Sequence, residues 1–244
     1  MTEELLKKSQ KEHFDSIAKE YAQRINSKGY QYYFGVTSGK ILGALKAHLP
    51  GLEGAAGLDV GCGNGDLTAE IRKHCLSMAG TDLSEGMIGV AKEIHRGPGL
   101  EFSAASCDGL PFPDSSFDFS VTTHLFHHLV EEELMSKAIA EMKRVTKSGG
   151  LIVSVDTNRL NPLVSFGQYL MVRRGVDTGQ ERLVWPRTLL RLMRAAGLRV
   201  VADGGFCLVP HLVPGLGFLN KYFEATFLHL LGKDYLIAAR VDKR

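Results

Sequence analysis

A glycine-rich loop is the part of this sequence whose residue types and spacing point most clearly to chemistry. Residues 57–66 read G-L-D-V-G-C-G-N-G-D and follow a short apolar run. Glycines in such a loop remove Cβ atoms, permit positive φ angles and let a ligand lie against the backbone. Nicotinamide, flavin and nucleotide folds all use loops of this kind, and a tight turn without a ligand is the alternative. The loop therefore predicts a nucleotide-like ligand without identifying it.

An acidic residue follows where a ribose would need one. Asp82 lies 21 residues after Gly61, close to the spacing at which Rossmann folds place a carboxylate on ribose hydroxyls. The alternative is a local role, in which Asp82 caps the next helix together with Ser84. One carboxylate is not expected to fill both roles easily. Asp82 indicates a nucleoside but does not name the cofactor.

Strands and helices alternate around these residues. Two helices are expected first, at about 14–25, ending near Gly29, and from a capping Ser38 to about residue 49. Further helices are expected at 67–74, 84–92, 131–147 and 186–196, with a turn at 148–150. Strand-like runs lie at 56–60, 78–82, 100–105, 117–122, 151–155, 199–202 and 236–241. This alternation predicts an α/β fold whose parallel sheet carries helices on both faces, within a single domain over 1–244.

Composition and charge narrow the range of partners. The net charge of +2, with acids and bases mixed along the chain, gives no field typical of a nucleic-acid binder. The four cysteines lack C-x-x-C spacing, so no metal and no disulfide framework is expected, and the chain is expected in the cytoplasm. The N-terminus lacks the apolar core of a signal peptide. The longest apolar stretch, 205–219, is interrupted by two prolines and three glycines, so no transmembrane segment is expected.

Five motifs together identify the cofactor. They are D-V-G-C-G-N-G, T-D-L-S-E-G-M-I, C-D-G-L-P-F-P-D-S-S-F-D-F, T-T-H-L-F-H-H-L and R-V-T-K-S-G-G, in this order between Phe14 and Val155. In this order and spacing the sequence resembles the class I S-adenosylmethionine-dependent methyltransferases, especially the small-molecule group that includes ubiquinone/menaquinone C-methyltransferases. The resemblance implies a Rossmann-like, doubly wound, mostly parallel seven-stranded sheet with an antiparallel last strand. It also implies the cofactor S-adenosylmethionine and the product S-adenosylhomocysteine.

The resemblance also implies roles for particular side chains. Asp59 would help to orient the ammonium group of the methionine portion, and Asp82 would accept hydrogen bonds from the ribose. Leu83 would cover one face of the adenine, and Asp108 would lie at its amino edge. The full set placed at the cofactor is Asp59, Gly61, Cys62, Gly63, Asp82, Leu83, Met87, Cys107, Asp108, Gly109, Thr123 and His124.

Other ligands and reactions fit the sequence less well. The loop has the compact G-x-G-x-G spacing rather than the G-x-G-x-x-G of nicotinamide folds. The (N/D)-P-P-(Y/F) motif of nucleic-acid amino methyltransferases is replaced after the fourth strand by T-T-H-L, at 122–125. There is no Pro-Cys pair for methylation of cytosine C5. A small-molecule acceptor is therefore expected, and no nucleic acid.

Three histidines follow the fourth strand, and each is a candidate for acid–base chemistry. An imidazole suits a general base at neutral pH, and such a base is needed only when the acceptor must lose a proton. His124 and His128 are the preferred candidates. Local packing or capping by His127 and His128 is the alternative.

Three less regular segments are expected to select the acceptor. They are an N-terminal helical arm or lid at 1–35 and two connections at 157–185 and 206–232. The candidate acceptor contacts are Tyr21, Tyr33, His128, Phe166 and Phe218. Because the connections are apolar, the expected acceptor is small and largely apolar or lipid-like, and a peripheral membrane contact is compatible with them. The alternative for 206–232 is ordinary core packing against the sheet. The sequence does not indicate an oligomeric state.

A second class of function remains open on the sequence. Domains of this kind also bind the cofactor as sensors or as non-catalytic partner subunits, and some relatives modify the cofactor without methylating anything. The intact glycine loop with Asp82 and Asp108 favours a working pocket over a degenerate one.

Overall fold

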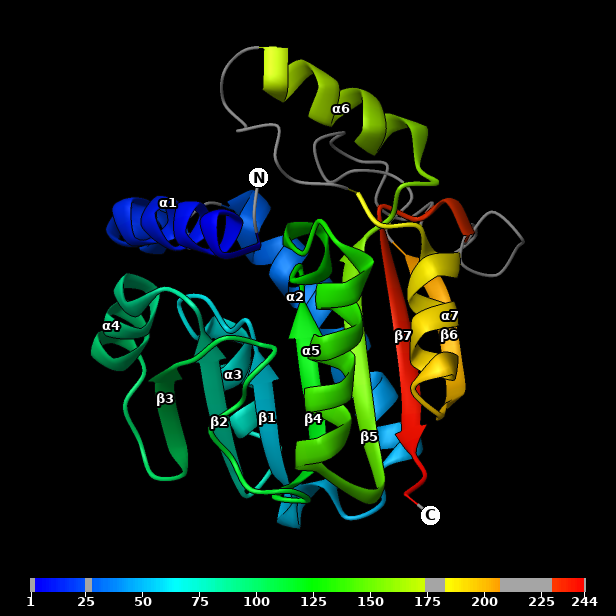
Figure 1. Ribbon diagram of the computed structural model, residues 1–244. Coiled ribbons are helices and arrows are strands. Elements are labelled where there is room, and N and C mark those ends of the chain that lie inside the picture. The colour runs from blue at the N-terminus through cyan, green and yellow to red at the C-terminus, as the bar shows by residue number, and fades with distance from the viewer. Residues whose placement is uncertain (1–2, 25–27, 174–182, 207–229, 244) are drawn as a thin grey trace.

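The computed structural model describes residues 3–24, 28–173, 183–206 and 230–243 (Figure 1). Its strands are β1 (Ala56–Val60), β2 (Ser77–Asp82), β3 (Leu100–Ala104), β4 (Phe117–Thr123), β5 (Thr146–Thr157), β6 (Leu198–Phe206) and β7 (Asp234–Val241). They form one seven-stranded sheet in the order β3-β2-β1-β4-β5-β7-β6. The first five strands pair in parallel, and β7 is antiparallel to both of its neighbours, β5 and β6. The predicted mostly parallel sheet with an antiparallel last strand is confirmed.

The helices cover both faces of this sheet. They are α1 (Glu3–Arg24), α2 (Lys28–His48), α3 (Asp66–Arg72), α4 (Glu85–Ile94), α5 (Glu132–Val145), α6 (Pro162–Arg173) and α7 (Pro186–Ala195), with short 3₁₀ turns η1 (Leu52–Gly54) and η2 (Phe126–His128). Alternation along β5 shows how the two layers arise, since Ile152 faces the core with α5 and α7 and its neighbours Leu151 and Val153 face the core with α2 and α3. Burial of these opposite faces stabilises both helix layers.

The sheet order creates a crevice where β1 lies between β2 and β4. Chain connections leave β1 in one direction and β4 in the other, which makes this a topological switch point. Ligands of open α/β sheets bind outside the carboxyl ends of the strands at such a point. Helix α1 crosses over this edge of the sheet and packs on α4 (Figure 1), with Ala18 buried against Met87 and Val90.

Two predicted boundaries near the N-terminus are wrong. Gly29 does not end a helix and Ser38 does not begin one, because α2 runs without a break from Lys28 to His48. The Ser38 hydroxyl donates to the Gly35 carbonyl within the helix, at 3.4 Å, so this side chain is satisfied there rather than at a cap. One helix therefore joins the predicted arm to the core, where Ile41 and Leu45 are fully buried.

The predicted helix 131–147 is too long at its C-terminal end. Helix α5 ends at Val145, and Thr146 already has extended backbone angles and pairs with Phe117. Strand β5 then continues through the glycines at 149 and 150, where a turn was expected, with a register shift against β4. The Thr146 hydroxyl, bonded to the Met142 carbonyl at 2.7 Å, closes the end of the helix.

The two predicted acceptor-side connections are described in part. The segment 157–185 contains α6, which stands apart from the sheet at the carboxyl ends of its strands (Figure 1). Residues 207–229, most of the second connection, lie outside the described residues. No helix among the described residues is both long and apolar enough to cross a membrane.

Candidate functional site

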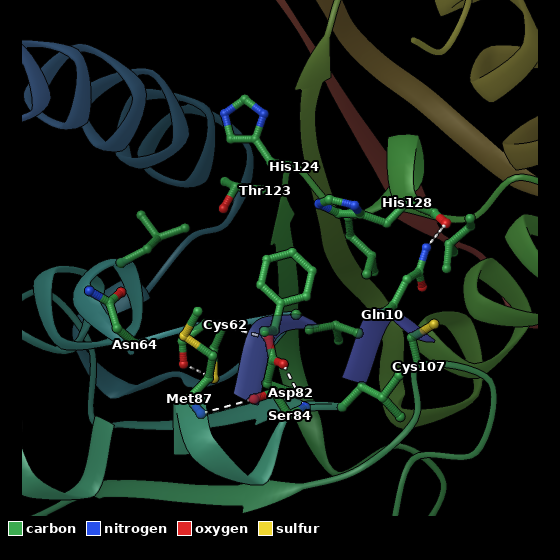
Figure 2. A pocket seen from close by; sticks show the side chains of 18 of the residues that line it. Gln10, Cys62, Asn64, Asp82, Ser84, Met87, Cys107, Thr123, His124 and His128 are labelled. Atoms are coloured by element: carbon green, nitrogen blue, oxygen red, sulfur yellow. Dashed lines mark hydrogen bonds between the residues drawn. The ribbon is translucent and has the colours of Figure 1, made fainter. Parts of the chain in front are cut away.

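A cavity lies at the switch point, between the ends of β1, β2 and β4 and the helices α1 and α2 (Figure 2). It contains most of the positions at which a cofactor was expected. Of the predicted residues, its lining includes Gly61, Cys62, Gly63, Asp82, Leu83, Met87, Cys107, Thr123, His124, Tyr33 and His128. Asp108 and Gly109 are not among the lining residues, and Asp59 lies fully buried behind the wall.

The glycine loop takes the conformation that its composition predicts. Gly61, Gly63 and Gly65 have φ angles of 76°, 52° and 82°, which L side chains rarely adopt. A Cβ on Gly63 would meet no protein atom within 4 Å, whereas one on Gly65 would lie 2.8 Å from the Phe102 ring. Gly63 is therefore bare toward open space in the cavity wall, and Gly65 is required for packing.

Asp82 fixes the shape of this loop. One carboxylate oxygen accepts from the Gly63 amide and the other from the Ser84 amide, both at 2.9 Å. Ser84 itself caps α4, since its hydroxyl accepts from the Met87 amide at 3.0 Å. Asp82 thus joins the loop to the start of α4, which is the local role given as the alternative, and it also lines the cavity in which a ribose was expected. Burial raises the pKa of its carboxyl.

Asp59 supplies a buried acceptor with an unused oxygen. Its Oδ2 accepts from the Thr68 hydroxyl at 2.7 Å, and Oδ1 has no hydrogen-bond partner. The residue is fully buried, and burial raises the pKa of its carboxyl to about 7. Buried polar atoms are rarely left unpaired because the lost hydrogen bonds cost free energy. The orphaned oxygen fits the position expected to face a ligand's ammonium group.

Helix α1 brings charged groups to the cavity that sequence reasoning missed. Lys7 lines the cavity and donates to Asp108 at 2.6 Å. Burial is the largest single influence on Asp108 and disfavours its ionisation, but the hydrogen bonds from Lys7 and Ser106 and the charge of Lys7 together outweigh it, so the pKa of this carboxyl is lowered. Asp15 accepts from the Ser84 hydroxyl at 2.5 Å and from the Gly86 amide at 2.8 Å. These contacts join α1 to the start of α4, and the carboxylate expected at the adenine edge already has a cationic partner.

The histidines after β4 have different surroundings. His124 has a φ of 53°, uncommon for a residue other than glycine, and its side chain contacts Tyr33 and Thr157. The His128 carbonyl accepts from Gln10 at 2.6 Å (Figure 2), and the ring makes an edge contact with Phe14. Burial lowers the pKa of both imidazoles, to about 3 for His128. Both rings are therefore neutral at physiological pH.

His127 belongs to a structural cluster with Asp156. Its Nδ1 lies 2.8 Å from Asp156 Oδ1, and the same carboxylate accepts from the amides of Phe126 and Thr157 at 2.7 and 2.8 Å. The possible metal-ligand atoms of His124, His127 and Asp156 lie within 4.8 Å of one another, a spacing that would allow them to coordinate a cation. Because the Asp156 oxygens already hold the backbone of η2, we assign this cluster a structural role.

Of the remaining predicted acceptor contacts, only the Phe166 side chain is described, and it does not reach the cavity. Phe166 on α6 is 60% exposed and is not among the lining residues. Tyr21 lies on α1, with its side chain outside the described part, and Phe218 falls outside the described residues altogether. The cavity is also lined by Phe14, Tyr30, Phe34, Thr37, Leu125, Leu129 and Leu134. For the three aromatic residues the signal was the helical spacing in 14–34, from which a lid was expected, whereas Thr37 and the three leucines carried no such signal.

Cysteine chemistry has no support at this site. Burial raises the pKa of Cys62 well above its ordinary value and that of Cys107 to about 12. Thiols with raised pKa values are poor nucleophiles because little thiolate is present.

Sheet order, glycine loop and cavity together define a class I methyltransferase fold. Comparison with known proteins agrees, since residues 58–154 match a family described as a methyltransferase domain. This part of the chain is a methyltransferase domain, and its fold is that of the class I S-adenosylmethionine-dependent methyltransferases.

Individual relatives show how far the likeness extends. The chain is 31% identical to a ubiquinone biosynthesis O-methyltransferase of Agrobacterium fabrum, over 66% of this chain and 65% of that protein. It is 32% identical to a ubiquinone/menaquinone biosynthesis C-methyltransferase of Campylobacter jejuni, over 40% of this chain and 43% of that protein. Magnesium protoporphyrin IX methyltransferase of Synechocystis, solved with bound S-adenosylhomocysteine, shares the fold with a TM-score of 0.68 at 16% identity, over 96% of this chain and 99% of that one. The chain thus spans a little under two thirds of the length of three ubiquinone biosynthesis O-methyltransferases that it matches.

Proposed function

We propose that this protein binds S-adenosylmethionine in the cavity and transfers its methyl group to a small, largely apolar acceptor. The observation that carries the proposal is the pairing of a bare Gly63 with the orphaned Oδ1 of Asp59. An open backbone surface suits the methionine portion, and a buried carboxylate oxygen suits its ammonium group. The cofactor would supply a methyl group on a positively charged sulfur.

The protein's own residues would hold and orient the reactants. In this proposal Asp82 keeps the loop in place and faces the ribose, while Leu83 and Met87 cover the adenine. Thr123 and His124 line the methionine end, at the carboxyl end of β4. Positioning of this kind contributes much of the rate of a displacement, roughly 7–11 kcal/mol in well-oriented systems.

The acceptor side of the cavity is apolar with a few polar groups. Phe14, Phe34, Leu125, Leu129 and Leu134 line it, and a pocket of this character takes an apolar molecule whose orientation is fixed by a few hydrogen bonds. The relatives named for ubiquinone biosynthesis support an acceptor of quinone-like size and polarity. In this proposal the chain is a single domain, and helices α1 and α2 of the N-terminal arm cover the cavity.

Of the two candidate histidines, the geometry favours His124 for a role at the acceptor. Its ring contacts Tyr33 in the cavity wall, whereas the very low pKa of His128 makes that imidazole a weak base.

Calorimetry and turnover together test the proposal. Wild-type protein should bind S-adenosylmethionine and S-adenosylhomocysteine with micromolar affinity, roughly −8 kcal/mol, and should not bind NAD. Incubation with S-adenosylmethionine and a cell extract should release S-adenosylhomocysteine. Binding without turnover would instead assign the chain to the sensors and partner subunits, and binding of NAD alone would refute the cofactor.

A further inference from the structure

We propose that Tyr33, Asp234 and His124 form a subsite that binds a phenolic hydroxyl of the acceptor and removes its proton. This rests on the proposed methyltransferase function and narrows it to O-methylation of a hydroxylated aromatic. Asp234 carries no signal in the sequence, and only the fold brings it to the cavity.

Three distant elements meet at this subsite. Tyr33 comes from α2, His124 follows β4, and Asp234 begins β7. The Tyr33 hydroxyl donates to Asp234 Oδ2 at 2.6 Å and lies 2.7 Å from His124 Nε2. Tyr33 and His124 line the cavity, whereas Asp234 is fully buried behind them.

The hydrogen bonds fix which atoms carry protons. A carboxylate only accepts, so the Tyr33 proton points to Asp234, and the contact with His124 is made by Nε2–H donating to the phenol oxygen. His124 Nδ1, 3.2 Å from the Thr157 hydroxyl, is then the acceptor of that contact. A phenol that donates to a carboxylate has a more electron-rich oxygen and is a better acceptor for an incoming hydroxyl.

The surroundings hold this arrangement in place. The Lys233 ammonium lies 3.8 Å from the centre of the Tyr33 ring and 3.3 Å from both Asp234 oxygens. His124 is held in its uncommon backbone conformation by a hydrogen bond that its backbone amide donates to the Val155 carbonyl, at 2.9 Å. A strained backbone conformation persists only where the surrounding contacts stabilise it, and such residues cluster at functional sites.

Proton transfer through this subsite balances. The acceptor O–H bond breaks as its oxygen bonds to the methyl carbon and the carbon–sulfur bond opens. The proton passes to the Tyr33 oxygen while the proton of Tyr33 moves to Asp234, so the positive charge on sulfur and the negative charge on the carboxylate disappear together. His124 Nε2–H stabilises the phenol oxygen during this exchange.

Proton affinity selects the class of acceptor. The proton ends on Asp234, so the relay costs less the more acidic the acceptor hydroxyl is, and phenols, like tyrosine, have pKa values of about 10. An aliphatic hydroxyl gives up its proton far less readily, and this relay would not ionise it. The apolar walls around the subsite suit an aromatic ring.

The direct test follows the ionisation of a bound phenol by its colour. The probe is 4-nitrocatechol, whose ionised form absorbs at longer wavelength. It is added to protein saturated with S-adenosylhomocysteine, at a pH below the pKa of its first ionisation. Wild type should bind the probe and shift its spectrum to the ionised form. Tyr33→Phe should weaken binding about tenfold, from loss of one hydrogen bond, and abolish the shift. Asp234→Asn should still bind the probe but leave it protonated.

Controls separate this subsite from the cofactor site and from general damage. Tyr32→Phe makes the same change one residue away on α2, at a side chain that is 44% exposed, and should behave as wild type. Tyr33→Phe leaves the buried Asp234 with one hydrogen bond fewer and should lower the unfolding temperature slightly, whereas S-adenosylhomocysteine affinity should be unchanged, which shows that the variant keeps the folded cofactor site.

Each of the other outcomes contradicts either the proposed function or the subsite. Failure of wild type to bind S-adenosylhomocysteine refutes the proposed function. Binding of S-adenosylhomocysteine without the probe, or an unchanged shift in Tyr33→Phe, refutes the subsite alone. A shift abolished by EDTA and restored by Mg²⁺ would assign the effect to a cation at His124, His127 and Asp156 and would also overturn it.

Discussion

Replacing Asp59 by Asn should stabilise the folded protein at alkaline pH and weaken cofactor binding at the same time. Asn has the same shape and can keep its oxygen toward Thr68, so the change removes the charge and little else. Asp59 is fully buried, and its pKa is raised from 3.8 to about 7. One pKa unit corresponds to about 1.4 kcal/mol, so ionising this carboxyl inside the fold costs about 4 kcal/mol relative to the unfolded chain.

The sign follows from proton counting. Between pH 3.8 and 7 the folded state keeps the Asp59 proton and the unfolded state has lost it. Unfolding therefore releases a proton, and the contribution of Asp59 to stability falls as pH rises, levelling above pH 7. The variant lacks this contribution, so its stability advantage over wild type should grow by about 3 kcal/mol between pH 5 and pH 8.

Urea unfolding of both proteins at several pH values measures this difference directly. All other titrating groups are common to the two proteins, so their contributions cancel in the difference. Calorimetry with S-adenosylhomocysteine should show wild-type affinity rising toward pH 8 as Asp59 ionises, with the variant weaker and insensitive across the same range. Parallel stability curves would refute the buried ionisable carboxyl, and equal affinity at pH 8 would refute its role toward the ammonium group.

Three further predictions follow from the same cavity. Gly63→Ala should lower S-adenosylhomocysteine affinity more than tenfold and stability by only about 1 kcal/mol. Gly65→Ala, whose Cβ would press on Phe102, should mainly lower the unfolding temperature. Calorimetry and thermal scans separate the two effects, and equal losses of affinity in the two variants would contradict this difference. His128→Ala should leave the pH–rate profile unchanged between pH 5 and pH 9, because the pKa of His128 is about 3, and a lost limb of that profile would restore it as a base. Lys7→Met should raise S-adenosylhomocysteine affinity a few-fold, because it frees Asp108 from an ion pair that stabilises the fold by at most about 1 kcal/mol. Weaker binding in a calorimetric titration would show that Lys7 itself holds the ligand.

The cofactor side of the site could be predicted from the sequence because its determinants are local. The turn at Gly61–Gly65 follows from glycine's freedom at positive φ, and Asp82 lies one β-α unit further on, where a parallel sheet returns the chain to the same edge. The sheet itself followed from strand and helix periodicity, and its antiparallel last strand from family resemblance. The predicted helix boundaries were less accurate. Ser38 bonds within α2 instead of capping it, and α5 ends at Val145 because Thr146 pairs with Phe117 in the sheet.

Packing between remote elements decided the rest. The contact of Lys7 with Asp108 spans 101 positions of the chain and that of Tyr33 with Asp234 spans 201. Neither has a periodicity or a motif, because a hydrogen bond between side chains depends on the relative placement of whole helices and strands. Phe166 shows the converse, since its apolar character predicted a pocket wall and the placement of α6 leaves it 60% exposed. The sequence determined the glycine loop through backbone constraints on single residues, whereas the opposite wall of the cavity formed only when α1, α2 and β7 packed around the crevice.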